Sequence, residues 1–423
     1  MTEEQDNQVQ QEINKAINFL GQNKFLEAEN TCLKIIDTGD NADAYHILSS
    51  IKIYQQEFED SIKYVKKSIA INDGNPGYHV TLGCAYSAKE DYESSIIAFK
   101  SAIKINNKIA QVHFYLGESY RKLKKYNDAI SSFYNTTELS PDHVGAYLLL
   151  GVVYQEKKQF DLSIKAFQKC IEIMPDYAEA HLNLGLCYLL IGDYENGWRE
   201  YEWRRKIIKE SSDKLSREWS GQNLENKTLL VLDEGADGNL IHFIRLIREL
   251  KKESCKVAVQ CSEEAIPLIK NQKWIDKAIT ADDFPEHDFY IPIGSLMNVL
   301  KYNPNHHDQI FPYIEVDADK ISKKDTDQVN IGLVFETDRN SNAHDDESID
   351  PGLFENIFNQ EHNVICLDKY VTNETLPNYC SKHITYSNLQ DLSIVISNLD
   401  LIITVDHLVA HLAGALNLSL IHI

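Results

Sequence analysis

The sequence predicts an α-helical solenoid over its first half, followed by an α/β domain built on parallel sheets. A Leu-Gly-x-x-Tyr signature recurs every 34 residues, and short β-branched runs alternate with helical stretches after residue 221. Fixed self-similarity at such a period is typical of stacked helical repeats. With 423 residues the chain exceeds what one hydrophobic core usually holds, so we expect two or more domains.

The repeat frame carries more than its signature. The four signatures are Leu82-Gly83-x-x-Tyr86, Leu116-Gly117-x-x-Tyr120, Leu150-Gly151-x-x-Tyr154 and Leu184-Gly185-x-x-Tyr188. An aromatic residue follows each Gly sixteen positions later, at Phe99, Phe133, Phe167 and Tyr201. Pro141 and Pro175 come eight residues after their own Phe, where a helix must stop. The pattern resembles the tetratricopeptide repeat (TPR).

Counting back from these copies extends the repeats toward the N-terminus. Residues 42–75 fit a further copy with Ser49 in place of Gly, and 9–41 fit another with one residue deleted. We therefore predict a TPR solenoid of about six helix pairs over 9–208, preceded by a polar tail at 1–8. Degenerate outer copies are expected of capping repeats.

The second helix of the last pair, 194–205, differs from its counterparts because it carries Trp198, Tyr201 and Trp203. Three large aromatic side chains on one helix exceed what a repeat needs. We expect them to dock the solenoid onto the following domain, with a ligand platform as the alternative.

The second half alternates strand and helix patterns, which indicates a parallel sheet covered on both faces. After a linker at 209–226, a first unit (227–302) has expected strands at 228–232, 256–259 and 288–293 and helices at 239–251 and 263–269. After a second linker at 303–328, a second unit (329–423) has expected strands at 329–335, 364–367, 401–405 and 418–423 and helices at 352–359, 390–398 and 408–416. Since this unit ends on an apolar strand without a covering helix, we expect it to be incomplete.

Composition excludes several classes of protein. The N-terminus is polar without an apolar signal region, and no apolar stretch is long enough to span a membrane. Eight cysteines lack zinc spacing, so we expect reduced core thiols in a cytoplasmic protein and no metal site. The net charge is −22, and no basic cluster interleaved with aromatics occurs, so nucleic-acid binding is not expected.

The turn after the first strand of the α/β region, 233–239, contains Gly235 and Gly238 and opens a helix. A glycine-containing loop between a strand and a helix N-terminus can approach a ligand closely and offer backbone amides to an anion. The spacing matches neither a dinucleotide-binding fingerprint nor a P-loop.

Further motifs occur in a fixed order along the chain. They are Gly197-Trp198 with Tyr201-Glu-Trp203-Arg204, Glu234 with Gly238 and Ile241-His-Phe243-Ile-Arg245, Asp288-Phe289 with Pro292, Ser295-Leu296, Pro312-Tyr313-Ile314, and 398–406 with 410–416. Together they resemble bacterial TPR proteins fused to a heptosyltransferase-like glycosyltransferase domain. The resemblance implies a GT-B architecture of two Rossmann-like halves facing a cleft, with no essential metal, and we expect the second half to be truncated here.

The resemblance also implies a nucleotide-sugar donor, held mainly by the C-terminal half. Asp406 and His411 match the donor-side motif, with His407 where the family has a small hydroxyl residue. Residues 407–410 would form a first helical turn whose free amides can hold a diphosphate. Gly235 and Gly238 are assigned to the donor site as well. The alternative for His411 is a histidine hydrogen-bonded inside the domain.

On the acceptor side the chain departs from the family. The family's first loop ends in Gly-Asp, whose Asp is placed to deprotonate the acceptor hydroxyl, but Asn239 stands here and an amide cannot act as a base. Asp237 is the candidate replacement if the loop shifts. An acidic segment at 345–347 also stands where the family has an Arg-Ser pair suited to phosphate.

TPR arms bind extended peptides along the face formed by the first helix of each pair. The asparagine-ladder positions are Thr81, Tyr115, Leu149 and Asn183, so only one is Asn, and no carboxylate clamp is evident. His113, Phe114, Glu118, Tyr147 and Asn183 are left as a mixed aromatic groove, suited to an unknown peptide or to packing between helices.

Two functions remain open from the sequence. The first is a glycosyltransferase-like enzyme, with no cofactor beyond its nucleotide-sugar donor, acting on an acceptor presented by the TPR arm. The second is a non-catalytic TPR interaction scaffold that carries a degenerate transferase domain.

Overall fold

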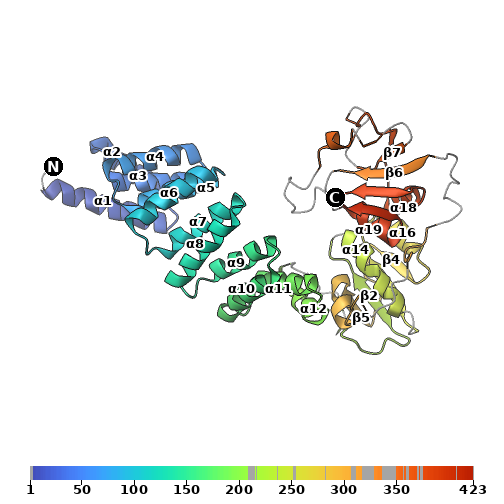
Figure 1. Ribbon diagram of the computed structural model, residues 1–423. Helices are drawn as coiled ribbons and strands as arrows, with labels where there is room; N and C mark the ends of the chain where they lie inside the picture. Colours follow the sequence, from blue (N-terminus) through green and yellow to red (C-terminus); the bar gives the residue numbers. More distant parts are fainter. Residues whose placement is uncertain are drawn as a thin grey trace. The chain divides into compact units, whose positions relative to one another are not determined.

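The computed structural model divides into two compact units, Met1–Asp193 and Tyr194–Ile423. It describes residues 3–207, 215, 217–235, 237–250, 254–281, 283–305, 311–316, 328–335, 349–355, 357–358, 362–368, 371, 375–405 and 407–422. Figure 1 labels the elements of each unit.

The first unit is built of α-helices that pack in antiparallel pairs (Figure 1). The helices are α1 (Glu3–Gly21), α2 (Phe25–Thr38), α3 (Ala42–Tyr54), α4 (Phe58–Ile71), α5 (Pro76–Ala88), α6 (Tyr92–Ile105), α7 (Ala110–Lys122), α8 (Tyr126–Leu139), α9 (Val144–Glu156), α10 (Phe160–Ile173) and α11 (Ala178–Leu190). As predicted, α8 and α10 end just before Pro141 and Pro175. Helix α1 begins at Glu3, inside the segment that the sequence suggested was a polar tail.

The signature glycines are required by close packing within each pair. A Cβ atom on Gly83 would lie 2.4 Å from Cε1 of Phe99. The same contact would be 2.5 Å between Gly117 and Phe133 and 2.4 Å between Gly151 and Phe167. No real Cβ fits at such distances, so the sixteen-residue spacing of Gly and Phe records a direct helix–helix contact.

The turn inside each pair also repeats. The residue two positions before the second helix has a positive φ angle at Asn23, Gln56, Glu90, Lys124, Lys158 and Gly192. In these turns the next amide donates to the carbonyl five residues back, as from Asp91 to Tyr86 at 2.9 Å. This is the bonding of a Schellman motif, in which glycine is the preferred residue. Five of the six turns therefore place a side chain in a conformation that suits glycine better.

The second unit contains two five-stranded sheets in which every described strand pair is parallel. The first sheet has the order β1-β5-β2-β3-β4, with β1 (Arg217–Glu218), β2 (Thr228–Leu232), β3 (Lys256–Gln260), β4 (Lys277–Ile279) and β5 (Phe289–Pro292). The second has the order β10-β9-β6-β7-β8, with β6 (Val329–Val334), β7 (His362–Cys366), β8 (Lys382–His383), β9 (Leu401–Thr404) and β10 (Ser419–His422). The predicted α/β class is confirmed for this region.

Helices and short 3-10 turns connect these strands. They are α12 (Tyr194–Tyr201), α13 (Arg204–Ile207), α14 (Asp237–Phe243), η1 (Ile244–Leu246), α15 (Ile247–Leu250), α16 (Ile266–Lys270), η2 (Ile293–Ser295), α17 (Leu296–Val299), η5 (Pro351–Phe354), α18 (Leu389–Ser397) and α19 (Leu408–Ala415). The side chains of β2, β3, β6 and β9 are mostly buried, as expected of strands covered on both faces. In β10, at the edge of its sheet, all four residues are exposed.

Each sheet reverses its direction of winding once. In the first sheet the chain runs outward from β2 to β3 and β4, then returns to place β5 on the other side of β2. In the second it runs from β6 to β7 and β8, then returns to place β9 beside β6. Such a reversal opens a crevice at the carboxyl ends of the two central strands, where ligands of parallel α/β sheets bind.

The boundary between the units differs from the sequence boundary at 208, because α12 and α13 belong to the second unit. Trp198 donates from Nε1 to the carbonyl of Tyr302 at 2.9 Å and packs edge-on against Phe243. The aromatic helix thus docks on the α/β region, as its composition suggested. The expected linker at 209–226 likewise contributes β1 and the buried Trp219, whose amide donates to Tyr290.

Candidate functional site

The first part of the candidate site is the loop that joins β2 to α14. It contains Asp233, Glu234 and Gly235, and α14 begins at Asp237. Gly235 has φ +87° and is exposed, so the turn uses a left-handed conformation that glycine adopts without strain. This loop leaves the carboxyl end of β2 beside β5, at the reversal point of the first sheet.

The second part is α19, which follows β9 at the reversal point of the second sheet. Helices α14 and α19 pack against each other. A Cβ on Gly238 would lie 2.9 Å from Cδ2 of His411, and the rings of His242 and His411 are 5.9 Å apart between centroids. The structure therefore brings together Gly238 and His411, two residues that the sequence assigned to one site.

His407 caps the start of α19. Its Nδ1 accepts a hydrogen bond from the amide of Val409 at 3.1 Å, and its side chain is buried. The amide of Ala410 donates to the carbonyl of His407 at 2.9 Å. Two of the amides expected to be available for a diphosphate are thus already bonded. Asp406, the other predicted donor residue here, lies outside the described residues.

Two aspartates flank the first loop, Asp233 at its start and Asp237 at the beginning of α14. Asp237 accepts a hydrogen bond from Oγ of Ser262 at 3.0 Å. Burial, reinforced by the charge of Asp237, raises the pKa of Asp233 to about 6. The buried Oδ1 atom of Asp233 has no hydrogen-bond partner among the described residues. Asn239, at the family's base position, is exposed.

Sequence reasoning did not single out Asp233 or Ser262. Asp233 directly follows the last residue of β2, which is the position from which parallel sheets present functional side chains. This signal was available in the sequence. The contact of Ser262 was not, because it joins residues 25 positions apart through the packing of β3 beside β2.

His242 of α14 and Arg245 of η1, which follow the loop in the chain, contact aromatic side chains. Burial, Arg245 and His411 lower the pKa of His242 to about 4, so its imidazole is neutral at neutral pH. The neutral ring accepts a long hydrogen bond from Nη2 of Arg245 at 3.4 Å. Arg245 also stacks over the rings of Tyr302 and Tyr313. A permanent positive charge is therefore fixed near the packed helices α14 and α19.

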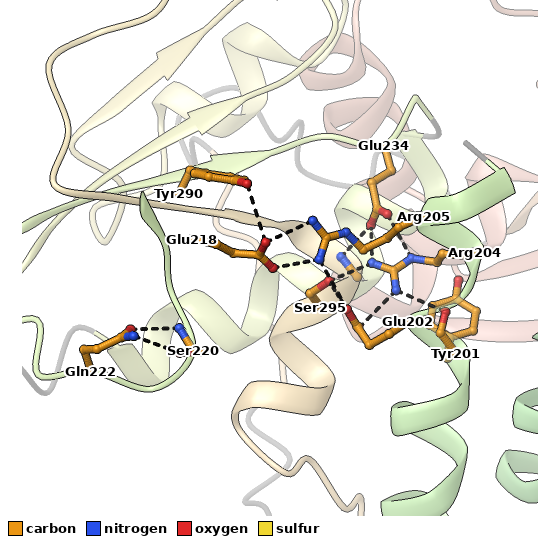
Figure 2. A network of polar contacts seen from close by, with 11 residues as sticks. Tyr201, Glu202, Arg204, Arg205, Glu218, Ser220, Gln222, Glu234, Tyr290 and Ser295 are labelled. Carbon is orange, nitrogen blue, oxygen red and sulfur yellow. Dashed lines mark hydrogen bonds and ion pairs between the residues drawn. The ribbon is translucent and has the colours of Figure 1, made fainter. Parts of the chain in front are cut away.

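Glu234 takes part in the polar network shown in Figure 2. Arg204 donates to its two carboxylate oxygens from Nε at 2.8 Å and from Nη2 at 3.0 Å. Beside this pair, Arg205 makes a second two-point contact with Glu218, at 2.7 and 3.1 Å. The network joins the start of α13 to the loop after β2 and to η2.

In the first unit, the predicted groove residues make contacts within the solenoid. His113 is buried and its Nε2 lies 3.0 Å from the carbonyl of Asn107, and His181 makes the same contact with the carbonyl of Pro175 two repeats later. Phe114 packs against Phe133 and His143. These side chains have a role in repeat packing, which was the alternative left open by the sequence.

The remaining groove residues are Glu118, Tyr147 and Asn183. Burial raises the pKa of Glu118. Tyr147 is partly buried against two neighbouring core clusters. Asn183 is partly exposed and donates from Nδ2 to the carbonyl of Glu179 in its own helix at 2.9 Å. None of these contacts tests peptide binding, which stays a prediction.

A cavity of about 370 Å³ lies elsewhere on the repeats, between α4, α5 and α6. Its lining residues are Lys66, Ile69, His79, Leu82, Tyr86, Ser94, Ile97, Ala98 and Ser101. Ile97 is 67% exposed. The equivalent positions in neighbouring repeats are Lys63, Ser131 and Lys165. An apolar residue at an otherwise polar position is the signal of this cavity in the sequence.

Within the described ranges, no cluster of His, Cys, Asp and Glu side chains has the arrangement of a metal site. Among the same residues, no helix combines the length and apolar character needed to cross a membrane.

Comparison with known proteins identifies the repeats. Family models of the tetratricopeptide repeat match residues 76–109, 111–143, 144–177 and 166–198. No curated protein matches the chain.

Several solved structures are similar to this chain at low sequence identity. MamA from Desulfovibrio magneticus RS-1 is 22% identical over 40% of this chain and 95% of its own, with a TM-score of 0.37. PilF of Pseudomonas aeruginosa is 14% identical over 49% and 94%, with a TM-score of 0.44. YrrB, described as a TPR protein with an unusual peptide-binding site, is 19% identical over 42% and 91%, with a TM-score of 0.37. The N-terminal part of the chain, to about residue 200, is a helical TPR solenoid, and an α/β region of parallel sheets follows it.

Proposed function

We propose that the second unit is a GT-B-type glycosyltransferase domain, which transfers a sugar from a nucleotide-sugar donor to a hydroxyl acceptor presented by the TPR arm. The observation that supports this most is the meeting of two reversal points, where Gly238 in the first turn of α14 packs on His411 of α19. Ligands of parallel α/β sheets bind at such points.

The donor would bind at the start of α19. A diphosphate there gains from the helix dipole and from backbone amides once the His407 ring rotates away from Val409. Arg245, fixed by two tyrosine rings, supplies a cation close to α14. Asp406 follows β9 in sequence and is proposed to hold sugar hydroxyls, as the resemblance implies.

The acceptor would be activated by the Asp233 and Asp237 carboxylates. In the reaction the bond between the sugar anomeric carbon and the diphosphate oxygen breaks, and a bond from that carbon to the acceptor oxygen forms. The acceptor proton passes to a carboxylate, and the nucleotide diphosphate leaves. With its pKa raised to about 6, Asp233 is ionised at pH 7 yet is a stronger base than an ordinary aspartate.

The test is binding of nucleotide diphosphates by the full chain. UDP, GDP, ADP and dTDP are titrated separately by calorimetry, and hydrogen exchange is followed in the peptide that covers 407–415. Binding of one of them, with slower exchange in that peptide, supports the proposal. If none of the four binds at millimolar concentration, the transferase proposal fails and the interaction scaffold remains.

We further propose that the TPR arm captures a protein segment through an apolar side chain inserted beside Ile97. The cavity between α4, α5 and α6 and the exposure of Ile97 support this. Ile97→Lys introduces the residue found at the same position of two neighbouring repeats and so preserves the fold. Phage-displayed peptides selected on the full chain should lose binding to this variant. Equal binding of the selected peptides to both proteins would contradict the proposal.

A further inference from the structure

Arg204 has all of its N–H donors directed at acceptors. Nε and Nη2 donate to Glu234, and Nη2 also donates to Oγ of Ser295 at 3.0 Å. Nη1 donates to the carbonyl of Tyr201 at 3.3 Å and to Glu202 at 3.1 Å. The five N–H groups of a guanidinium are thereby accounted for, which a lysine with three donors could not reproduce.

Glu234 is held equally firmly from the other side. Its Oε2 accepts a hydrogen bond from the amide of Gly294 at 2.8 Å, in addition to those from Arg204. A Cβ on Gly294 would lie 2.6 Å from this oxygen and 2.7 Å from Nη2 of Arg204. The site therefore accepts the ion pair only because residue 294 has no side chain.

The pair is shielded from solvent. The side chains of Arg204 and Glu234 are 6% and 9% exposed. Burial by itself would lower the pKa of Arg204, but the hydrogen bonds and charge of Glu234 outweigh it and raise that pKa above its ordinary value. A buried two-point ion pair fixes the relative position of its partners more strictly than apolar packing would.

Because of where Glu234 lies in the chain, its ion pair with Arg204 can position the loop that carries Asp233. Glu234 stands between Asp233, whose carboxyl group has a raised pKa, and Gly235, whose left-handed turn leads to α14. Its side chain points to α13 and η2, as Figure 2 shows, while its backbone is part of the loop at the reversal point of the first sheet. Fixing this side chain fixes the backbone that presents Asp233.

We propose that Arg204 is a positioning residue for the loop at 233–235, and that it sets the placement of the Asp233 carboxyl group at the site. The catalytic meaning of this placement rests on the proposed transferase function. The placement itself does not rest on that function, because it is a property of the loop in the protein without ligand.

The test uses the full chain and separates positioning from stability. Arg204→Met leaves a buried carboxylate without its cation, so it is expected to destabilise the protein. The double variant Arg204→Met with Glu234→Gln removes both charges and is expected to regain most of the lost thermal stability. Arg205→Met is the matched control, because its partner Glu218 is 39% exposed and lies outside the loop.

The decisive readout is hydrogen exchange without ligand, at a temperature where the variants are folded. For the double variant we expect at least tenfold faster exchange in the peptide covering 233–238 and no change in the peptide covering 401–405. For Arg205→Met we expect both peptides to exchange at the wild-type rate. Wild-type exchange at 233–238 in the double variant would overturn the positioning role. Failure of the protein to bind nucleotides, with faster loop exchange, would overturn only the transferase function.

Discussion

The imidazole of His411 lies directly against the backbone of Gly238, and a Cβ on that glycine would be 2.9 Å from the ring. This contact joins α19, the helix that follows β9, to the first turn of α14, the helix that follows β2. It is therefore one of the contacts through which the two halves of the second unit meet, and it depends on the absence of a side chain at residue 238.

Gly238→Ala is expected to force the His411 ring away and to lower the free energy of unfolding by about 1–3 kcal/mol, the usual effect of overpacking. Gly414→Ala is the control, because a Cβ there meets nothing within 4 Å. In the interior of α19 that substitution is expected to be neutral or to stabilise by up to about 1 kcal/mol. Urea unfolding of the two variants measures both effects, and equal stabilities would contradict the contact.

The signature glycines of the repeats make a similar close contact that can be tested by alanine substitution. Gly117→Ala would place a Cβ 2.5 Å from Cε1 of Phe133, whereas Gly145→Ala meets Phe114 at an ordinary 3.4 Å. We expect the first to destabilise by about 1–3 kcal/mol and the second to change stability by less than about 1 kcal/mol. Thermal unfolding followed by circular dichroism checks the difference. A tolerated alanine at 117 would show that the helix pair is looser than described.

The left-handed turns between helices can be tested with the same substitution, Lys→Gly, at two positions of different backbone conformation. Lys158 has φ +57°, while Lys165 is an exposed residue inside α10. Lys158→Gly is expected to stabilise the protein by about 0.5 kcal/mol, because glycine adopts this conformation without strain. Lys165→Gly is expected to destabilise by about 0.7–1 kcal/mol through lower helix propensity. The two unfolding midpoints should shift in opposite directions, and shifts of the same sign would count against the turn conformation.

The lowered pKa of His242 leads us to expect that the protein loses stability in acid. Its pKa is lowered to about 4 in the folded protein from an ordinary value near 6.5, so the unfolded chain binds the additional proton between these values. Stability from this group is complete above pH 6.5 and falls as the pH drops toward 4. His242→Gln should lose less stability than wild type between pH 6.5 and 4, by about 1–3 kcal/mol. Parallel pH profiles of the two proteins would contradict the lowered pKa.

The titration of Asp233 changes the stability of the protein in the opposite direction, over part of the same pH range. Its pKa is raised to about 6, so the folded protein binds the additional proton and loses stability as the pH rises from about 4 to 6. Asp233→Asn removes the buried charge and should increase stability at pH 7 by about 1–2 kcal/mol while leaving it nearly unchanged at pH 4. Chemical unfolding at the two pH values tests this, and a destabilising effect at pH 7 would indicate that the carboxylate has a partner there.

The features that the sequence predicted well depend on local spacing. Gly83 and Phe99 recur in register with their equivalents, so one contact explains three copies of a pattern. Alternation of strand and helix predicted the parallel sheets for a similar reason. Periodicity assigned α12 to the last repeat, and a family model of the repeat also matches residues 166–198. Its aromatic composition, not its period, indicated that it packs on the second unit, as Trp198 does against Tyr302.

Contacts made by tertiary packing could not be predicted. Arg204 and Glu234 are 30 residues apart, and nothing in either segment identifies the other as its partner. The capping role of His407 is similar, because its ring was expected beside a donor and instead accepts the amide of Val409. The placement of Gly238 against His411 was implied only by the resemblance, since 173 residues separate them.

The central claim is that a nucleotide diphosphate binds where α14 and α19 meet. Calorimetric titration of the full chain with UDP, GDP, ADP and dTDP, repeated with Gly238→Ala and Gly414→Ala, tests it most directly. The account predicts that one nucleotide binds wild type and Gly414→Ala alike and binds Gly238→Ala at least tenfold more weakly. Equal affinity for all three proteins would place the nucleotide elsewhere, and no binding to any of them would contradict the claim.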